Sequence, residues 1–169
     1  MKINLKNIWT LSLGIAAMLL VSCAKNKDQN EDKKSADKNV IFSKGAKITN
    51  NNFKGSAWLS MLAENDTIYN TQIGNVTFEP GARTNWHYHR GGQILLVTKG
   101  KGYYQEKGKH IVEIKKGDVI KCPPNVIHWH GAAVDDTLVH IAISTSTNKG
   151  SVVWLEPVSD SQYSDVKNN

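Results

Sequence analysis

Three histidines and a glutamine within residues 81–132 have the types and the spacing of metal ligands. His87 and His89 are two positions apart, so on a β-strand their side chains point to the same face. Gln93 joins them if the strand continues through the two intervening glycines. His128 lies about forty residues downstream, a distance that antiparallel hairpins can fold back across a sheet. These four residues therefore predict one four-ligand metal site.

This ligand set defines the chemistry that the site could support. Three neutral imidazoles and one carboxamide oxygen suit divalent manganese, iron, nickel, cobalt or zinc, and geometry alone does not choose among them. With Gln93 in place of a carboxylate, the metal keeps its full positive charge and is a stronger Lewis acid, which favours small anions and substrate oxygens that become alkoxides. The alternative is that the histidines are core residues with satisfied hydrogen bonds.

Three other histidines differ in their expected roles. His130 shares a strand face with His128, which makes it a candidate general acid or base, with a fifth ligand or a core hydrogen bond as the alternatives. His140 is expected on the next strand of a hairpin. A three-residue loop would pair it with His130 and turn it inward, whereas a two- or four-residue loop would pair it with Gly131 and turn it outward. His110 follows a Lys-Gly-Lys turn and is expected to be exposed.

The intervals between these residues resemble the two sequence motifs of the cupin superfamily. The first motif is a glycine, five residues, His-x-His, three residues, an acidic ligand, six residues and a glycine, and here it falls on Gly81, His87, His89, Gln93 and Gly100. The second is a glycine, five residues, a proline and a histidine five positions further on, here Gly117, Pro123 and His128. Every interval is met.

The chain departs from those motifs at three positions. Gln93 replaces the acidic ligand, and Ala132 replaces an asparagine near the end of the second motif. Asn125 replaces a glycine, and asparagine still tolerates a left-handed turn.

Longer runs are similar to one subgroup, the small single-domain cupins that include manganese-dependent hydroxynitrile lyases. These runs are VTFEPGARTNWHYH at residues 76–89, GQILLV at 92–97 and HWHGAA at 128–133, and the resemblance extends over residues 56–163. It implies a jelly-roll β-barrel, also called a double-stranded β-helix, with His87, His89, Gln93 and His128 as ligands and manganese as the first candidate metal. It also implies that His140 faces the pocket.

Hydrophobic patterning predicts an all-β domain. Short apolar runs separated by Gly, Asn, Asp and Pro are typical of strands joined by tight turns. They predict strands at residues 41–48, 57–63, 71–78, 92–98, 102–106, 111–114, 119–122, 126–133, 138–145 and 152–155, with a helical turn around 159–163. Trp86 and Trp129 alternate with the histidines and suit either a homodimer surface or a second packing layer. We therefore expect a single sandwich or barrel domain over residues 40–169, with its core at about 72–145.

The N-terminal segment has the pattern of an exported lipoprotein. Two lysines precede an apolar run that ends in Leu-Val-Ser before Cys23, so residues 1–22 are interpreted as a signal peptide and Cys23 as the lipidated residue. Residues 23–39 are polar and are expected to form a disordered tether. The protein is therefore expected in the cell envelope, with a lipid anchor as its only membrane contact. Cys122 is expected to be a buried structural thiol.

These features favour a metal-dependent enzyme that acts on a small molecule, with His130 and His140 moving protons and cyanohydrin cleavage as the reaction that the resemblance suggests. An iron-dependent oxygenase is an alternative because three histidines with open positions also suit dioxygen. A non-catalytic surface module is another, with Trp58, Tyr103 and Tyr104 lining a binding pocket. The formal charge of +6 is spread along the chain without a basic helix or an aromatic-studded basic strand, so no nucleic-acid partner is expected.

Overall fold

The computed structural model describes residues 41–165. The predicted signal peptide, the tether and the lipidated Cys23 lie outside the described residues. The described residues belong to one compact unit. None of the helices within residues 41–165 has the length and apolar character needed to cross a bilayer.

The described part of the chain is almost entirely made of strands. Two strands predicted from the sequence, at 57–63 and 119–122, occur with these bounds, while the segment 41–48 contains only a two-residue strand. The helical elements are η1 (Thr147–Lys149) and α1 (Asp160–Ser164). The strands are β1 (Ala46–Lys47), β2 (Phe53–Lys54), β3 (Ala57–Ala63), β4 (Gln72–Phe78), β5 (Arg83–Thr84), β6 (His87–His89), β7 (Gln93–Glu106), β8 (Val112–Lys115), β9 (Val119–Cys122), β10 (His128–Ala132), β11 (Leu138–Ser144) and β12 (Val152–Trp154).

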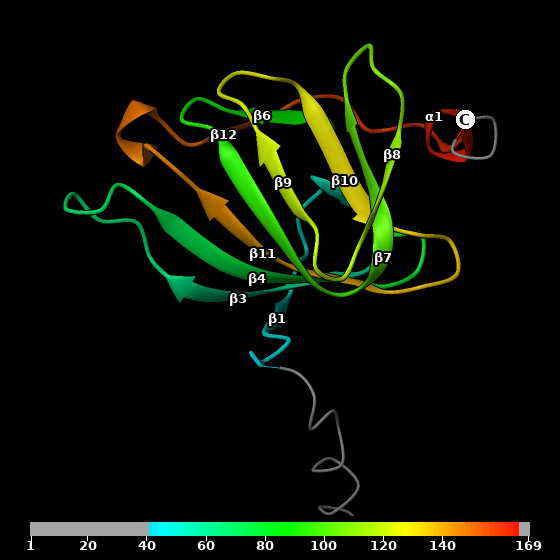
Figure 1. Ribbon diagram of the computed structural model, residues 1–169, viewed down its shortest axis with the longest axis horizontal. Helices are drawn as coiled ribbons and strands as arrows, with labels where there is room; N and C mark the ends of the chain where they lie inside the picture. Colours follow the sequence, from blue (N-terminus) through cyan, green and yellow to red (C-terminus); the bar gives the residue numbers. More distant parts are fainter. Residues whose placement is uncertain (1–40, 166–169) are drawn as a thin grey trace, which may run out of the picture. The chain divides into compact units, whose positions relative to one another are not determined.

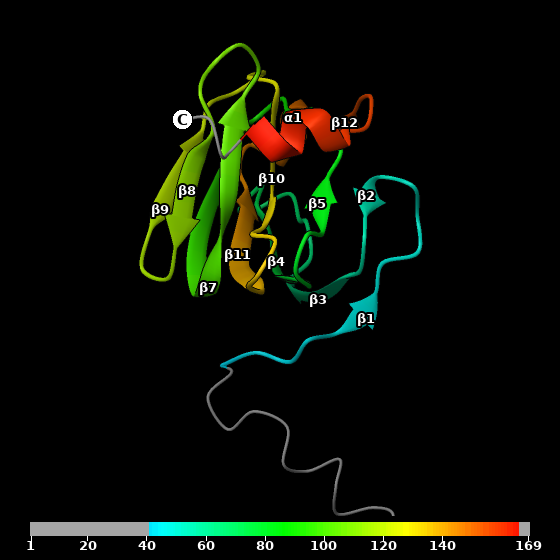
Figure 2. The same ribbon diagram turned by 90° about the vertical axis from the view of Figure 1, so that its right-hand side faces the viewer.

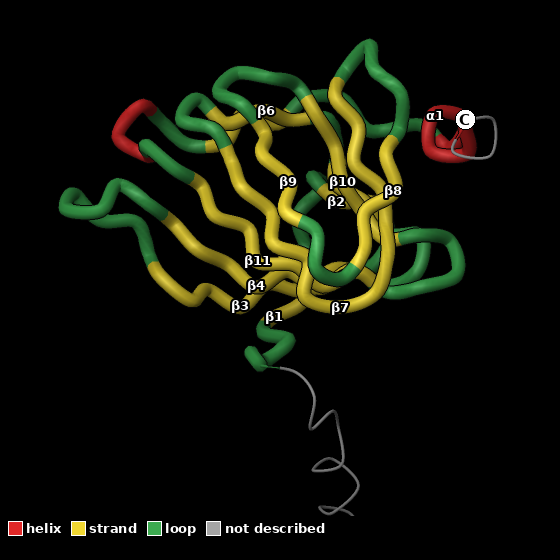
Figure 3. The backbone as a smooth tube through the Cα atoms, in the orientation of Figure 1, coloured by secondary structure: helices red, strands yellow, loops and turns green. Residues whose placement is uncertain are grey.

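Strand β7 joins the two halves of the fold. Its first half pairs with β11 and β9, and its second half pairs with β10 and β8, all antiparallel. Beyond β11 the sheet continues through β4, β3 and β1, and beyond β10 it continues through β5 and β2. Figure 1 and Figure 3 show that the strands curl into a half-barrel. The predicted all-β jelly-roll class is confirmed.

The sequence predicts two strands where the structure has β7 alone. The interruption was expected around residues 99–101, but backbone pairing continues on both sides of Gly100. Gly100 has φ 71°, and a Cβ there would lie 1.8 Å from the carbonyl oxygen of Thr137. A glycine at this point lets the strand bend from one half of the sheet into the other without ending.

Two clusters of buried side chains fill the fold. The first lies between the curled halves and includes Phe78, Leu95, Ile114 and Leu138, each with no exposed surface. The second lies outside β7 and β10 and consists of Trp86, Tyr103, Trp129, Ala133, Val158 and Tyr163. The two tryptophans are therefore covered by the C-terminal segment of the same chain, so they form a second packing layer and are not a free dimer surface. Figure 2 shows α1 lying beside these strands.

Arg83 attaches this C-terminal segment to the sheet. Its buried guanidinium donates two hydrogen bonds to the carbonyl oxygen of Val158 and one to Asp160, at 2.7 Å. The same guanidinium lies over the ring of Tyr163, 4.4 Å from its centroid, and the Tyr163 hydroxyl donates to the carbonyl of Ala132. A buried cation is tolerated here because its donors are satisfied and a carboxylate is adjacent.

Strand β10 approaches β5 too closely for a side chain at Gly131. A Cβ at this position would lie 2.5 Å from the carbonyl oxygen of Ala82 and 2.5 Å from the Cβ of Arg83. We expect Gly131→Ala to lower the free energy of unfolding by about 1–3 kcal/mol, the usual cost of overpacking, as measured by urea denaturation. Gly74→Ala is the matched control, because the added methyl would come closer than 3 Å only to the end of the flexible Leu59 side chain. Equal losses in the two variants would contradict this account.

Candidate metal and catalytic site

The two histidines of the first motif lie on β6 and point to one side of it. His87 and His89 are both buried, whereas Tyr88 between them is half-buried. The strand ends at His89, where the Gly92 amide donates to the His89 carbonyl and closes a turn. The sequence left open whether one strand continues from His89 through the two glycines to Gln93. Such a continuous strand does not form. Gln93 instead begins β7, and its side chain is still buried in the same cavity.

A second turn places the histidine of the second motif. Asn125 has φ 62°, the left-handed conformation expected when asparagine replaces the motif glycine, and its amide donates to the His89 carbonyl at 2.9 Å. β10 then begins at His128, which lies directly opposite His87 in the antiparallel pair of β10 and β6. The ring centroids of His87 and His128 are 4.3 Å apart. The turn at Asn125 therefore links the backbones of the two motifs close to the point where their histidine side chains come together.

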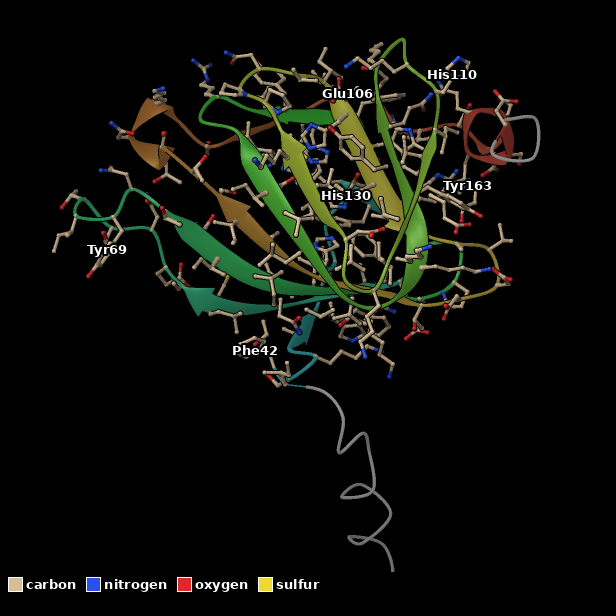
Figure 4. All side chains as sticks on the ribbon, in the orientation of Figure 1. Phe42, Tyr69, Glu106, His110, His130 and Tyr163 are labelled. Carbon is tan, nitrogen blue, oxygen red and sulfur yellow. The ribbon has the colours of Figure 1, made fainter. Side chains whose placement is uncertain are left out.

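The four predicted ligands come together in the structure. His89 has its ring centroid 5.3 Å from that of His87 and 5.8 Å from that of His128. The Oε1 atom of Gln93 lies 3.3 Å from Nε2 of His128. These groups lie inside the curl of the strands, where Figure 4 labels His130, whereas the exposed His110 lies on the loop between β7 and β8.

Hydrogen bonds to the backbone fix which nitrogen of two histidines can bind a metal. The Nδ1 atoms of His87 and His128 lie 2.9 Å from the carbonyl oxygens of Asn85 and Val126. A carbonyl oxygen only accepts, so each Nδ1 carries the proton and each Nε2 keeps a lone pair. A backbone carbonyl in this position is the usual outer partner of a metal-bound histidine.

The polar atoms of the cavity fit a bound cation. Nε2 of His89 is buried and has no hydrogen-bond partner among the described residues. Nε2 of His128 and Oε1 of Gln93 face each other as two acceptors. A divalent cation would supply the positive charge that these acceptors lack. The chemistry of the donor set therefore fits the predicted metal, with His87, His89, Gln93 and His128 as its proposed ligands. His89 is not among the histidines whose ligand atoms already lie within 4.8 Å of one another.

Burial keeps all five clustered histidines neutral. Desolvation lowers the pKa of His87 and His130 well below the ordinary range, and it also lowers the pKa of His128. Desolvation lowers the pKa of His89 and of His140 to about 4. Their lone pairs are therefore available near neutral pH, as metal binding and base catalysis both require.

The structure brings His130 and His140 into contact. Nδ1 of His130 lies 3.2 Å from Nε2 of His140, and both residues line the cavity. The orientation of His140 was to be inferred from a predicted hairpin, and that hairpin does not form. β11 pairs with β4 and β7, so His140 lies opposite Val76 and Val97 and not beside β10. His140 reaches His130 across the interior of the curl, because the two strands belong to opposite halves of the fold.

His130 also has the geometry of a ligand. Ligand atoms of His87, His128 and His130 all lie within 4.8 Å of one another, a spacing that could hold one metal ion. The fifth-ligand alternative for His130 is thus compatible with its position. The bond to His140 occupies Nδ1 of His130, which leaves only its Nε2 for a metal or a substrate.

The cavity beside these residues is lined by both polar and apolar side chains. Its volume is about 160 Å³. The polar lining residues are mainly Thr84, His87, His89, Gln93, His130 and His140. The apolar lining residues are mainly Phe53, Leu59, Met61, Val76, Val152 and Trp154. None of the described residues that line it is an acid, a lysine or an arginine. The cavity therefore suits a small neutral molecule, since a buried charge without a partner is costly.

Sequence reasoning missed the apolar lining of the cavity, and the aromatic residues named for the binding-module alternative lie elsewhere. Tyr103 and Tyr104 belong to the two buried clusters, and Trp58 packs under the ammonium group of Lys44, so none of the three lines the cavity. Cys122 is buried, and burial raises the pKa of its thiol to about 12, as suits a structural cysteine. That Trp154 lines the cavity could be inferred only from the pairing of β12 with β6.

Comparison with known proteins identifies similar chains. The sequence profile of the cupin domain matches residues 74–144. An (R)-mandelonitrile lyase from Granulicella tundricola is 48% identical over 89 residues, which are 53% of this chain and 68% of the relative. A cupin-like protein from Thermotoga maritima has a solved structure with a TM-score of 0.73 and 52% identity, covering 75% of this chain and 96% of that one. A double-stranded β-helix protein from Klebsiella pneumoniae, at 20% identity and a TM-score of 0.53, covers 69% of this chain and 96% of its own and shares the fold.

The neutral histidines make stability depend on pH. The pKa of His140 falls from 6.5 to about 4 on folding, so the unfolded chain binds the proton first as the pH drops. This residue's contribution is present above pH 6.5 and is lost progressively between pH 6.5 and 4, a loss of about 3 kcal/mol. We expect urea unfolding of the metal-free protein to show a smaller acid-induced loss in His140→Gln than in the wild type. The exposed His110→Gln is the control, and identical pH dependence in all three proteins would contradict the prediction.

Proposed function

Because the chain belongs to the cupin family, we propose that it is a metal-dependent enzyme that cleaves or forms a bond next to the hydroxyl group of a small neutral molecule. The observation that carries this proposal is the cluster of neutral imidazoles with unshared lone pairs beside an uncharged cavity. The reaction named for the Granulicella tundricola relative, mandelonitrile cleavage, is the first to test. Manganese is the first metal to test and iron the second.

The proposed ligand set determines what the remaining polar side chains of the cavity must do. A divalent cation held by His87, His89, Gln93 and His128 would stabilise negative charge that develops on a substrate oxygen. The four ligands are uncharged, so they do not offset that positive charge. The chain itself must then orient the substrate and move its proton.

His130 and His140 are proposed to move that proton. Both are neutral, so a single proton lies between Nδ1 of His130 and Nε2 of His140. When His130 Nδ1 carries this proton, its Nε2 is a base that can accept the hydroxyl proton of a cyanohydrin. The carbon–carbon bond then breaks, its electron pair leaves with cyanide, and the proton returned from His130 gives hydrogen cyanide and an aldehyde.

The cavity supports the remaining requirements of this reaction. The backbone of His130 is fixed by the Thr84 hydroxyl, which contacts both its amide nitrogen and its carbonyl oxygen at 3.2 Å. The apolar side chains among the lining residues lower the polarity around the reacting atoms, which strengthens each polar interaction there. A base with a fixed backbone needs little reorganisation during the reaction.

Metal content tests the proposed ligands. We expect the purified protein to bind close to one equivalent of manganese or iron by elemental analysis, and Gln93→Ala and His128→Ala to lose most of it because each removes a donor atom. His110→Ala is the control, because this exposed residue lies outside the cluster. A folded wild-type protein that binds no added divalent metal would overturn the ligand assignment and favour a non-catalytic binding module.

Activity tests the role of His130. We expect His130→Gln to keep its metal and to lower kcat for mandelonitrile cleavage by about 100- to 10,000-fold, the usual contribution of a general acid or base. Loss of the metal in this variant would instead assign His130 as a ligand. Turnover that requires dioxygen would favour an oxygenase.

A further inference from the structure

The cavity is built from two kinds of chain segment. Its polar residues from Thr84 to Ser144 lie within the part of the chain that matches the cupin domain, residues 74–144. Phe53, Leu59 and Met61 precede that part, and Val152 and Trp154 follow it. The groups suited to chemistry therefore come from the family domain, whereas much of the apolar wall comes from its flanks.

Trp154 is the largest of these flanking side chains and is held on two sides. Strand β12 pairs with β6 so that Val152 lies opposite His89 and Trp154 lies opposite His87. Hydrogen bonds extend this pairing, because the Leu155 amide donates to the Trp86 carbonyl and the Trp86 amide donates to the Glu156 carbonyl. Backbone hydrogen bonds therefore fix the chain on both the N-terminal and the C-terminal side of Trp154.

The indole contacts both a proposed metal ligand and another part of the wall. Its ring centroid lies 4.7 Å from that of His87, with the two planes inclined by 37°. On its other side it lies 5.4 Å from the ring of Phe53, which in turn lies 5.9 Å from Phe78. A side chain packed in this way cannot turn aside for a larger ligand without breaking aromatic contacts.

We propose that Trp154 is a specificity-determining residue that sets the upper size limit of the substrate. This inference rests on the proposed function, since it concerns the same cavity. A cavity of about 160 Å³ is close to the size that holds one benzene ring. An indole is larger than that ring, so its removal would open space for a second fused ring beside His87.

The chemistry of the wall defines the class of molecule that is selected. The Trp154 and Phe53 rings offer apolar contact and no charge, and the Trp154 ring packs against the polar His87. A substrate with a small apolar group close to a neutral hydroxyl or carbonyl can contact both kinds of lining residue. A cationic group would lose its hydration without gaining a partner among these residues.

The test compares substrates that differ by one fused ring. Mandelonitrile and the cyanohydrin of 2-naphthaldehyde are supplied to the metal-loaded wild-type protein and to Trp154→Ala, with metal content measured in both. We expect the ratio of kcat/KM for the phenyl over the naphthyl substrate to fall at least about tenfold in the variant, within the range that pocket size controls in enzymes. Val153→Ala is the control, because this residue is on the same strand and does not line the cavity. Its ratio should match that of the wild type.

Binding provides a readout that is independent of turnover. Benzyl alcohol and 2-naphthalenemethanol are titrated by calorimetry into the same proteins, and we expect Trp154→Ala to gain affinity for the naphthyl alcohol alone. If the wild type cleaves neither cyanohydrin, the proposed reaction fails while this measurement still decides the role of Trp154. An unchanged preference between the two alcohols would overturn the inference. Trp154→Phe, which retains an aromatic contact with His87, replaces the alanine variant if that variant fails to fold or loses its metal.

Discussion

Two hydrogen bonds between imidazole Nδ1 atoms and backbone carbonyls determine what the cavity can bind. Each connects a histidine to the residue two positions before it, Asn85 for His87 and Val126 for His128. The local backbone thus specifies the tautomer, and the pairing of β6 with β10 brings the two prepared nitrogens together. Two further features limit where β10 can lie and so help to bring these nitrogens together. They are the close approach of β5 to β10 at Gly131 and the turn through Asn125.

The lack of charge in the cavity has an energetic cost and a chemical benefit. Five imidazoles share the interior without an acid among the described lining residues, so their polar atoms are only partly satisfied by one another. Such groups reduce stability when they are left without partners. In return, they offer uncharged lone pairs, and His130 and His140 form a neutral pair that shares one proton. Gln93 has the same effect, since it contributes an oxygen ligand without adding a negative charge.

The sequence alone was sufficient where the relevant information is local. The histidine pair, the glutamine and the turn at Asn125 are fixed by short intervals, and these residues lie together in the structure as expected. The errors concern pairings that depend on distant segments. His140 was expected on a strand that forms a hairpin with the strand of His130, in a register left open, but β10 and β11 pair with different parts of β7. Trp154 and Phe53 could not be placed in the cavity, because only the pairings of β12 with β6 and of β2 with β5 bring them there.

The position of β7 has a consequence for how the protein opens. Because β7 pairs with β8, β9, β10 and β11, neither half of the sheet can separate without breaking hydrogen bonds to that one strand. The two halves therefore cannot act as independent units of local unfolding, and the backbone amides of β7 should be among the last to exchange with solvent. Most of these pairings join residues far apart in sequence, which makes the search for the native topology slow. The cavity takes its lining from both halves of the sheet, so a chain in which β10 and β11 have not both paired with β7 lacks part of the site.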